Sequence, residues 1–233
     1  FAALGKKYNI KIIYDGAHAF GTKYHGQSLA NFGDAVTYSF HATKLFNTIE
    51  GGAVVVRDPA VYAKLNRLKN FGLDQGEPLE IGMNAKMNEF AAAMGICNLR
   101  HNDFAIEQRK LRYQYYYDQL HNLPGIQLNP EQDAMIQNAA YFPIIFHDRF
   151  GCCRETVSQR LIKENIYPRK YFSPLTSDSP SIKQNYIVQP TPIAQDYAGR
   201  VLTLPLYPDL DFAVIKKICA IISESSQVES NAS

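Results

Sequence analysis

Four polar side chains lie where two predicted strands end. Asp15 closes an apolar run that begins at residue 10, and His18 follows three positions later. Ser39 closes a second such run and stands five positions before Lys44. In open α/β sheets, ligands bind outside the carboxyl ends of the strands. The sequence therefore predicts that a carboxylate, a hydroxyl and an amine meet at one edge of a sheet.

These groups suit an aldehyde cofactor with a nitrogen-containing ring. An isolated lysine is usually a solvated surface charge, but Lys44 lies among small and apolar residues, where an amine can be neutral and form a Schiff base. Asp15 can keep a pyridinium nitrogen protonated, which makes the ring an electron sink. Ser39 can hydrogen-bond a phosphate. Together these residues predict a site for pyridoxal 5′-phosphate (PLP).

Two further residues have both a structural and a functional interpretation. His18 can be satisfied by hydrogen bonds within its own loop, or its ring can lie against the cofactor. Asn84 precedes a predicted helix and can serve as a turn residue. Asn88 is better placed to cap that helix, which leaves Asn84 available for another role, and the helix N-terminus beside it would suit an anion.

The composition describes an ordinary globular protein. The 233 residues include 46% hydrophobic residues and carry a formal net charge of +2, and no apolar run is long enough to span a bilayer. The four cysteines form no CxxC pair, which favours a reducing cytosol. The six histidines show no metal-binding spacing. The sequence therefore predicts a cytoplasmic protein that binds no nucleic acid, membrane or metal.

The elements that position the polar residues begin in the middle of a domain. Residues 1–9 are typical of the last turns of a helix that feeds a strand, which predicts that an N-terminal segment is absent. Asp58 and Pro59 suit the N-cap and first position of a helix that runs to about residue 70. The first strand is expected to be buried on both faces of a parallel sheet. Strands are predicted at residues 10–14, 34–40 and 52–57.

The second half of the chain predicts a smaller α+β domain. A loop over 71–82 is followed by helices at 88–99 and 103–122, separated at His101 and Asn102. Pro124 and Gly125 then divide a large cofactor-binding domain, residues 1–122, from a C-terminal domain, residues 123–233. The C-terminal domain is expected to contain a strand at 139–146, which Pro143 places at an edge or in a bulge. Helices are predicted at 154–165, 192–200 and 211–223, and an extended piece at 201–205. A long loop is expected at 167–192 and a frayed tail at 223–233.

Taken together, the motifs resemble those of the DegT/DnrJ/EryC1/StrS aminotransferases, and the resemblance covers essentially the whole chain. It implies the type I (aspartate aminotransferase) PLP fold: a mixed, mostly parallel sheet with helices on both faces, and a smaller C-terminal α+β domain. The matching stretches are Tyr-Asp-Gly-Ala-His-Ala-Phe-Gly (14–21), Ser-Phe-His-Ala-Thr-Lys (39–44), Glu-Gly-Gly-Ala (50–53), Gly-Met-Asn-Ala-Lys-Met-Asn-Glu (82–89) and Leu-Pro-Leu-Tyr-Pro (204–208).

The resemblance implies a role for each residue at the two strand ends. Lys44 would form the Schiff base with PLP and act as the base for the proton shift. Asp15 would pair with the pyridine nitrogen, and His18 would pack on the ring or hydrogen-bond to it. Ser39 would contact the phosphate. Family members carry a leading segment with a further phosphate-binding turn, and this sequence has no such turn before Asp15.

The resemblance also implies partners. Asn84 would reach the phosphate of a cofactor held by a second subunit, which implies a homodimer with shared active sites. Arg169 and Tyr171 lie in the long loop where the family contacts the nucleotide-sugar. The expected reaction moves an amino group from L-glutamate to a dTDP-4-keto-6-deoxyhexose, giving dTDP-4-amino-4,6-dideoxyglucose for cell-surface polysaccharide (O-antigen) biosynthesis.

Three alternatives stay open. The first is a 3-keto-6-deoxyhexose aminotransferase of the same family. The second is a PLP-dependent sugar dehydratase; some relatives of this kind have histidine in place of the lysine, so the presence of Lys44 argues against it. The third is a non-catalytic sugar-nucleotide-binding protein on the same fold.

Overall fold

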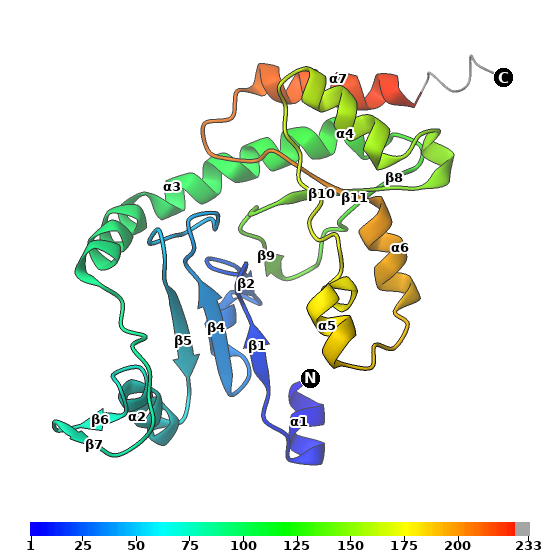
Figure 1. Ribbon diagram of the computed structural model, residues 1–233. Helices are drawn as coiled ribbons and strands as arrows, with labels where there is room; N and C mark the ends of the chain where they lie inside the picture. Colours follow the sequence, from blue (N-terminus) through cyan, green and yellow to red (C-terminus); the bar gives the residue numbers. More distant parts are fainter. Residues whose placement is uncertain (227–233) are drawn as a thin grey trace. The chain divides into compact units, whose positions relative to one another are not determined.

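The computed structural model describes residues 1–226, which divide into two compact units (Figure 1). Unit 1 comprises residues 1–106 and 132–140, and unit 2 comprises residues 107–131 and the chain from Tyr141 onward. The boundary predicted between residues 122 and 123 separates the large domain from the small domain of the family. It is a different division from these two units, and it stays a prediction. Helix α7 (Phe212–Ser225) continues two residues beyond its predicted end at residue 223. The rest of the tail that was expected to fray, from residue 227 on, lies outside the described residues.

A three-stranded mixed sheet organises unit 1. Its order is β1 (Ile13–Asp15), β4 (Ala35–Ser39), β5 (Gly52–Val56). The pair β1–β4 is parallel and the pair β4–β5 is antiparallel. Strand β4 is central, and its Val36 is buried. The strands predicted at residues 34–40 and 52–57 are therefore confirmed.

Strand β1 departs from its prediction. It is three residues long, and Ile13 is 68% exposed. Within the described chain β1 lies at the edge of the sheet. Ile13 and Asp15, on one face, are exposed, and Tyr14, on the other face, is half-buried. The expected burial on both faces is wrong for these residues, because an apolar run reports the preference of side chains and not the presence of a covering element.

Helix α1 (Ala2–Tyr8) precedes β1, and helix α2 (Pro59–Leu68) follows β5. The N-cap of α2 is as predicted, since the Asp58 carboxylate accepts a hydrogen bond from the Ala60 N–H at 2.8 Å. The predicted loop after α2 contains a small hairpin, β6 (Leu73–Asp74) and β7 (Glu77–Pro78).

A second small sheet brings sequence-distant segments of unit 1 together. Its order is β3 (Gln27–Ser28), β2 (Lys23–Tyr24), β9 (Met135–Ile136), and a 3₁₀ turn (Leu29–Asn31) follows β3. The β2–β9 pairing carries residues 132–140 back to the chain that follows β1.

Helix α3 (Glu89–Leu120) is one continuous helix of 32 residues, capped by Asn88, whose side chain accepts from the Ala91 N–H at 2.8 Å. The predicted interruption at His101 and Asn102 is wrong. Neither residue removes a backbone donor, and an asparagine or histidine inside a helix costs about 0.7 kcal/mol or less, against about 3 kcal/mol for proline. Asn102 is 9% exposed, and its weak propensity alone does not end the helix.

Unit 2 is built on an antiparallel sheet of order β11 (Val201–Leu204), β10 (Phe142–Phe146), β8 (Ile126–Leu128). Helices α4 (Arg154–Lys163) and α7 pack against each other, and α6 (Pro192–Arg200) lies against β10. The core contains Phe142, Ile144, Leu202, Ile215 and Ile218, all fully or almost fully buried. The predicted long loop contains a 3₁₀ turn (Thr176–Asp178) and helix α5 (Pro180–Asn185).

Strand β10 is the central strand and pairs in regular register, which corrects its prediction as an edge or bulged strand. Proline lacks the N–H that a sheet ladder uses, so Pro143 argued for an edge. The pairing of β10 with β8 begins only at Ile144, whereas Pro143 is opposite Thr203 of β11. Pro143 therefore lies where the strand has a single paired neighbour, and the remaining residues can be central.

The turn before β8 contains a glycine whose replacement should strongly destabilise the protein. Gly125 has φ +80°, and a Cβ there would lie 2.2 Å from the backbone nitrogen of Phe150. Gly125→Ala should therefore lower the free energy of unfolding by about 3 kcal/mol or more, because neither backbone can yield cheaply. Urea unfolding would measure it. Gly199→Ala in α6 is the matched control, since its Cβ would meet nothing within 4 Å; it should be neutral or stabilising by about 0.5–1 kcal/mol. Equal losses in both variants would contradict the prediction.

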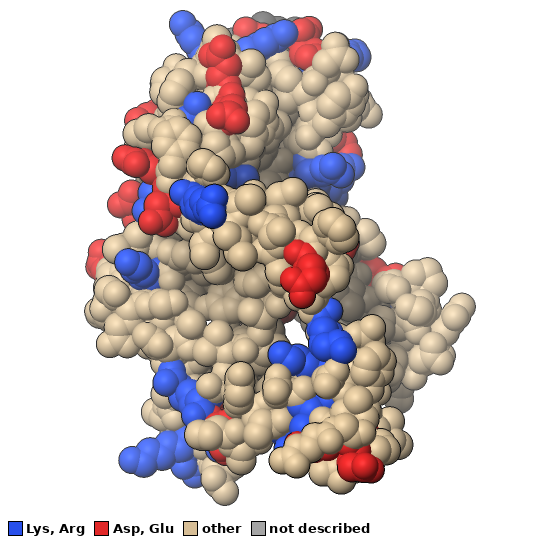
Figure 2. Space-filling model, turned by 90° about the vertical axis from the view of Figure 1, so that its left-hand side faces the viewer, with Lys and Arg blue, Asp and Glu red and all other residues tan. Residues whose placement is uncertain are grey.

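The surface is mixed in charge. Figure 2 shows one face of the molecule, on which Lys and Arg residues lie among Asp and Glu residues and much uncharged surface. Among the described residues, no helix combines the length and the apolar character that crossing a membrane requires.

Candidate active site

The parallel pair β1–β4 places two of the predicted residues at one edge of the sheet. Asp15 is opposite Thr37 in the register, and Ser39 ends β4 two positions further on. The Asp15 carboxylate accepts a hydrogen bond from the Ala17 N–H at 3.0 Å. This local turn fixes the carboxylate at the strand end while Asp15 stays exposed. The Ser39 hydroxyl accepts a long hydrogen bond, 3.5 Å, from the His41 N–H.

Lys44 and His18 meet directly. The Lys44 Nζ lies 2.6 Å from the His18 Nε2, across 26 residues of sequence. Burial lowers the pKa of His18 below its ordinary value of 6.5; the nearby Lys44 charge lowers it further, and Asp15 opposes both. His18 is therefore neutral near pH 7, and its ring nitrogen can accept a hydrogen bond from the lysine amine. Spacing could not show this contact, because it depends on how the two loops fold over the strand ends.

Aromatic packing holds the two loops together. The Phe20 ring stacks on Phe46, with centroids 4.4 Å apart, and meets Phe40 edge-on at 5.7 Å. Phe46 is buried and lies two residues beyond Lys44. The loop that carries Lys44 is closed by hydrogen bonds from the Phe40 N–H to the Gly51 oxygen and from the Thr48 N–H to the Phe40 oxygen, both 2.9 Å. Lys44 is thus presented by a constrained loop.

Asn138 is a residue of this region that sequence reasoning missed. It belongs to the returning segment 132–140, and its side-chain amide donates to the backbone oxygens of His18 and Phe20, at 2.8 and 2.9 Å. Its separation from His18 is 120 residues, and no motif connects the two positions. The available signal was weak: an asparagine just before an apolar strand.

Asn84 lies on the exposed segment that leads into α3. Its backbone forms an isolated bridge with Asn70, next to the end of α2. The structure therefore brings Asp15, His18, Ser39 and Lys44 to the same sheet edge, and within the described residues no hydrogen bond joins Asn84 to Asp15, Ser39 or Lys44.

The two predicted substrate residues lie in unit 2. The backbone of Arg169 pairs with Thr203 of β11 in both directions, at 2.9 and 2.7 Å, and the Arg169 side chain is exposed. The Tyr171 ring stacks on Phe172 at 4.8 Å and meets Tyr141 edge-on at 5.8 Å. These contacts hold residues 169–172 as an ordered strip beside β11.

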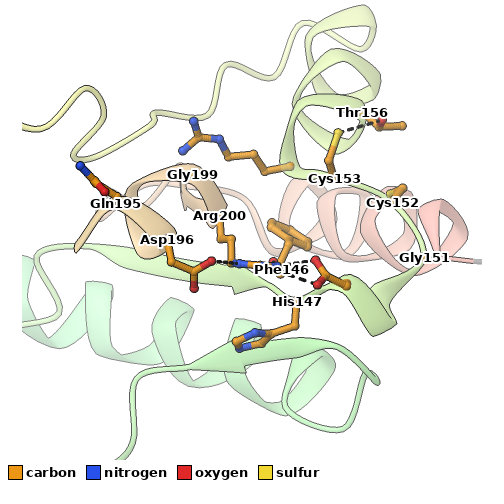
Figure 3. A pocket seen from close by; sticks show the side chains of 12 residues that line it. Phe146, His147, Gly151, Cys152, Cys153, Thr156, Gln195, Asp196, Gly199 and Arg200 are labelled. Atoms are coloured by element: carbon orange, nitrogen blue, oxygen red, sulfur yellow. Dashed lines mark hydrogen bonds and ion pairs between the residues drawn. The ribbon is translucent and has the colours of Figure 1, made fainter. Parts of the chain in front are cut away.

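A separate cavity of about 640 Å³ lies within unit 2, between α6, the start of α4 and the end of β10 (Figure 3). Arg200 is held there by Asp148 and Asp196, each at 2.6 Å. The Cys153 thiol lies 3.5 Å from the Thr156 hydroxyl, which lowers the pKa of Cys153. No site residue predicted from the sequence lines this cavity, and its two arginines, Arg154 and Arg200, are each paired with acidic residues of the same chain.

The donor set at the sheet edge fits PLP. It comprises an amine for an aldehyde, a carboxylate for a ring nitrogen and a hydroxyl for a phosphate, at the carboxyl ends of adjacent strands. A Cβ on Gly16 would lie 3.0 Å from the Thr37 oxygen and 2.9 Å from Val36, so glycine lets the chain turn tightly after Asp15. These features define an α/β site of the kind that aminotransferases use for PLP.

Comparison with known proteins agrees with this class. Residues 1–223 match the DegT/DnrJ/EryC1/StrS aminotransferase family, and the chain belongs to that family. Its cofactor, PLP, is the one predicted from the sequence.

Among curated relatives, the dTDP-4-amino-4,6-dideoxy-D-glucose transaminases of Shigella dysenteriae and Escherichia coli are each 36% identical, over 96% and 94% of this chain and 61% and 60% of their own lengths. The chain thus spans about 60% of these relatives.

Solved structures agree on the fold. A crystal structure of DesI with its TDP-sugar product superposes with a TM-score of 0.88 at 29% identity, covering 99% of this chain and 60% of that one. Helicobacter pylori PseC, an aminotransferase of pseudaminic acid biosynthesis, gives 0.90 at 25% identity, covering 97% and 62%. The predicted fold class is confirmed.

Proposed function

We propose that the protein is a PLP-dependent aminotransferase that moves an amino group from L-glutamate to C4 of a dTDP-4-keto-6-deoxyhexose. The observation that carries the proposal is the junction of Lys44 with His18 beside Asp15 and Ser39. The two relatives that are 36% identical are named for the corresponding product, which supports the choice of sugar. The product would serve cell-surface polysaccharide synthesis.

Four residues of unit 1 would hold the cofactor. Lys44 would bond to its aldehyde carbon, Asp15 would pair with the ring nitrogen, His18 would contact the ring and Ser39 the phosphate. When bound, PLP supplies a carbonyl that takes up an amino group and a ring that withdraws electrons. The carboxylate of Asp15 remains available for this task because only its Oδ1 takes part in the local turn.

The chain itself handles the proton. Lys44 would remove a proton from the carbon that bears the glutamate amino group and later return a proton to the sugar carbon. A positioned base of this kind contributes about 10²–10⁴-fold to the rate. Neutral His18 would accept a hydrogen bond from the Lys44 amine and so orient its nitrogen without competing for the proton. Arg169 and Tyr171 would contact the nucleotide-sugar.

A second copy of the chain would complete the site. Large apolar side chains are exposed along the segment before α3 and over the first turns of that helix, where Ile81 is 100% and Phe90 88% exposed. Burying one such side chain is worth about 1.5–3 kcal/mol, and an area of this kind is typical of an interface. Asn84 lies within the same segment. We therefore propose a homodimer in which Asn84 reaches the phosphate held by the partner. The other exposed apolar residues of this stretch are Leu79, Met83, Met87, Met94, Ile96 and Leu99.

Hybrid dimers test this arrangement. Lys44→Ala and Asn84→Ala should each be impaired alone, whereas subunit exchange between them should restore about a quarter of the wild-type activity, because each hybrid has one intact site. Analytical ultracentrifugation would confirm the dimer. If the mixture stays no more active than the two variants measured separately, the sites are not shared.

The reaction is tested by turnover of 4-keto and 3-keto dTDP-sugars side by side in the full-length protein, with and without L-glutamate. Amination of only the 4-keto sugar supports the proposal. Preference for the 3-keto sugar would identify the related aminotransferase instead. Product formed without any amino donor would indicate a dehydratase, and nucleotide-sugar binding without PLP or turnover would indicate a binding protein.

A further inference from the structure

We propose that Asn138 is a positioning residue for the active site, holding the loop after β1 so that His18 stays in contact with Lys44. Its consequence for catalysis rests on the function proposed above. Its structural part, the geometry of His18 and Lys44, can be tested without that function.

Both the amide nitrogen and the oxygen of the Asn138 side chain have hydrogen-bond partners in this region. Asn138 is 6% exposed. Its amide nitrogen donates to the His18 oxygen at 2.8 Å and the Phe20 oxygen at 2.9 Å, and its oxygen accepts from the Ala140 N–H at 3.0 Å. An asparagine amide has two protons to donate, so a single side chain satisfies both carbonyls. Without it, two partly buried loop carbonyls would lose these hydrogen bonds.

The loop is fixed from two directions at Phe20. Its main chain is held by Asn138, and its ring is stacked on Phe46, which follows Lys44 by two residues. A shift of the Phe20 backbone would therefore move the ring against the Lys44 loop and move His18 relative to the Lys44 amine. The 2.6 Å contact between the two side chains tolerates little displacement.

The segment that carries Asn138 is itself paired with the residues that directly follow the held turn. The strand pairing of Ile136 with Lys23, and the 2.8 Å hydrogen bond from the His25 N–H to the Ala134 oxygen, fix the preceding residues. The segment 132–140 thus holds the loop that carries His18 in place through these hydrogen bonds.

Two variants of the full-length protein test the proposal. Asn138→Asp keeps the size and the acceptor for Ala140 but removes both donated hydrogen bonds, and Asn138→Ala removes the side chain. Asp58→Ala, which removes the N-cap of α2 in the same unit, is the control for a general loss of stability. Should neither Asn138 variant fold, Asn138→Ser, which keeps one donor, replaces them and should give an intermediate result.

The first readout is the titration of the His18 ring by NMR in cofactor-free protein, with His18→Gln for assignment. In Asn138→Ala the pKa of His18 should rise toward its ordinary value, since the ring loses burial and its contact with Lys44; Asn138→Asp is read by kinetics alone, because its added carboxylate would itself raise this pKa. The second readout is kinetic: kcat should fall roughly tenfold or more, with KM for glutamate little changed, because misplacement acts on the chemical step.

The outcomes separate the two proposals. A folded Asn138→Ala variant with an unchanged His18 titration would overturn the positioning role, as would equal changes in Asp58→Ala. If wild-type protein neither binds PLP nor turns over, the proposed function fails, while the titration in cofactor-free protein still decides whether Asn138 positions His18.

Discussion

Replacing Lys44 with alanine in the full-length protein should lower kcat by about 10³-fold or more. The variant loses both the group that bonds to the cofactor and the base that moves the proton. Borohydride reduction followed by mass spectrometry should attach the cofactor covalently to the wild-type protein and leave the variant unlabelled. This measurement does not depend on having the correct sugar.

Two further lysine variants are controls for the Lys44→Ala result. Lys44→Arg keeps a cation on the same loop, yet it should be as inactive as alanine, because a guanidinium is not deprotonated in proteins. Lys64→Ala removes an exposed lysine of α2 in the same unit and should leave kcat within about twofold. Turnover by Lys44→Ala at the wild-type rate in ordinary buffer would remove Lys44 from the mechanism.

Asp15→Asn should lower kcat by about 10²-fold or more, a loss comparable to that from removing one preorganised charge-stabilising group. The asparagine oxygen can still accept from the Ala17 N–H, as Asp15 does at 3.0 Å, so the turn after β1 is retained. What disappears is the negative charge that keeps the ring nitrogen protonated. Steady-state kinetics and circular dichroism, measured together, separate the chemical loss from any loss of fold.

A matched charge change provides the control for Asp15. Asp58→Asn removes the same charge, and asparagine is as good an N-cap as aspartate, so α2 keeps its cap and kcat should stay within about twofold. A drop in Asp58→Asn as large as that in Asp15→Asn would show that net charge, and not the pyridine nitrogen, explains the effect.

The elements next to the candidate site were predictable because their signals are local. Strand β4, strand β5 and the Asp58 cap each depend on residues adjacent in sequence. The position of Asp15 and Ser39 at one sheet edge followed from the parallel order of two strands. The motifs around Lys44 then narrowed the chemistry to one cofactor.

Features that depend on distant packing were not predictable. The central place of β10 depends on where β8 and β11 pair with it. The continuity of α3 was misjudged for a different reason: the weak helix propensities of His101 and Asn102 are too small to end a helix. The contact of His18 with Lys44, and the hold of Asn138 on the His18 loop, join residues 26 and 120 positions apart, for which the sequence contains no periodic signal.

The return of residues 132–140 to unit 1 has a consequence for the order of events during synthesis. The loop after β1 is translated 120 residues before the asparagine that holds it. At about 5–20 residues per second, the interval is roughly 6–24 seconds. During that time the loop that carries His18 lacks the hydrogen bonds from Asn138. Unit 1 can therefore complete its folding only after residues 107–131, which belong to unit 2, have been translated.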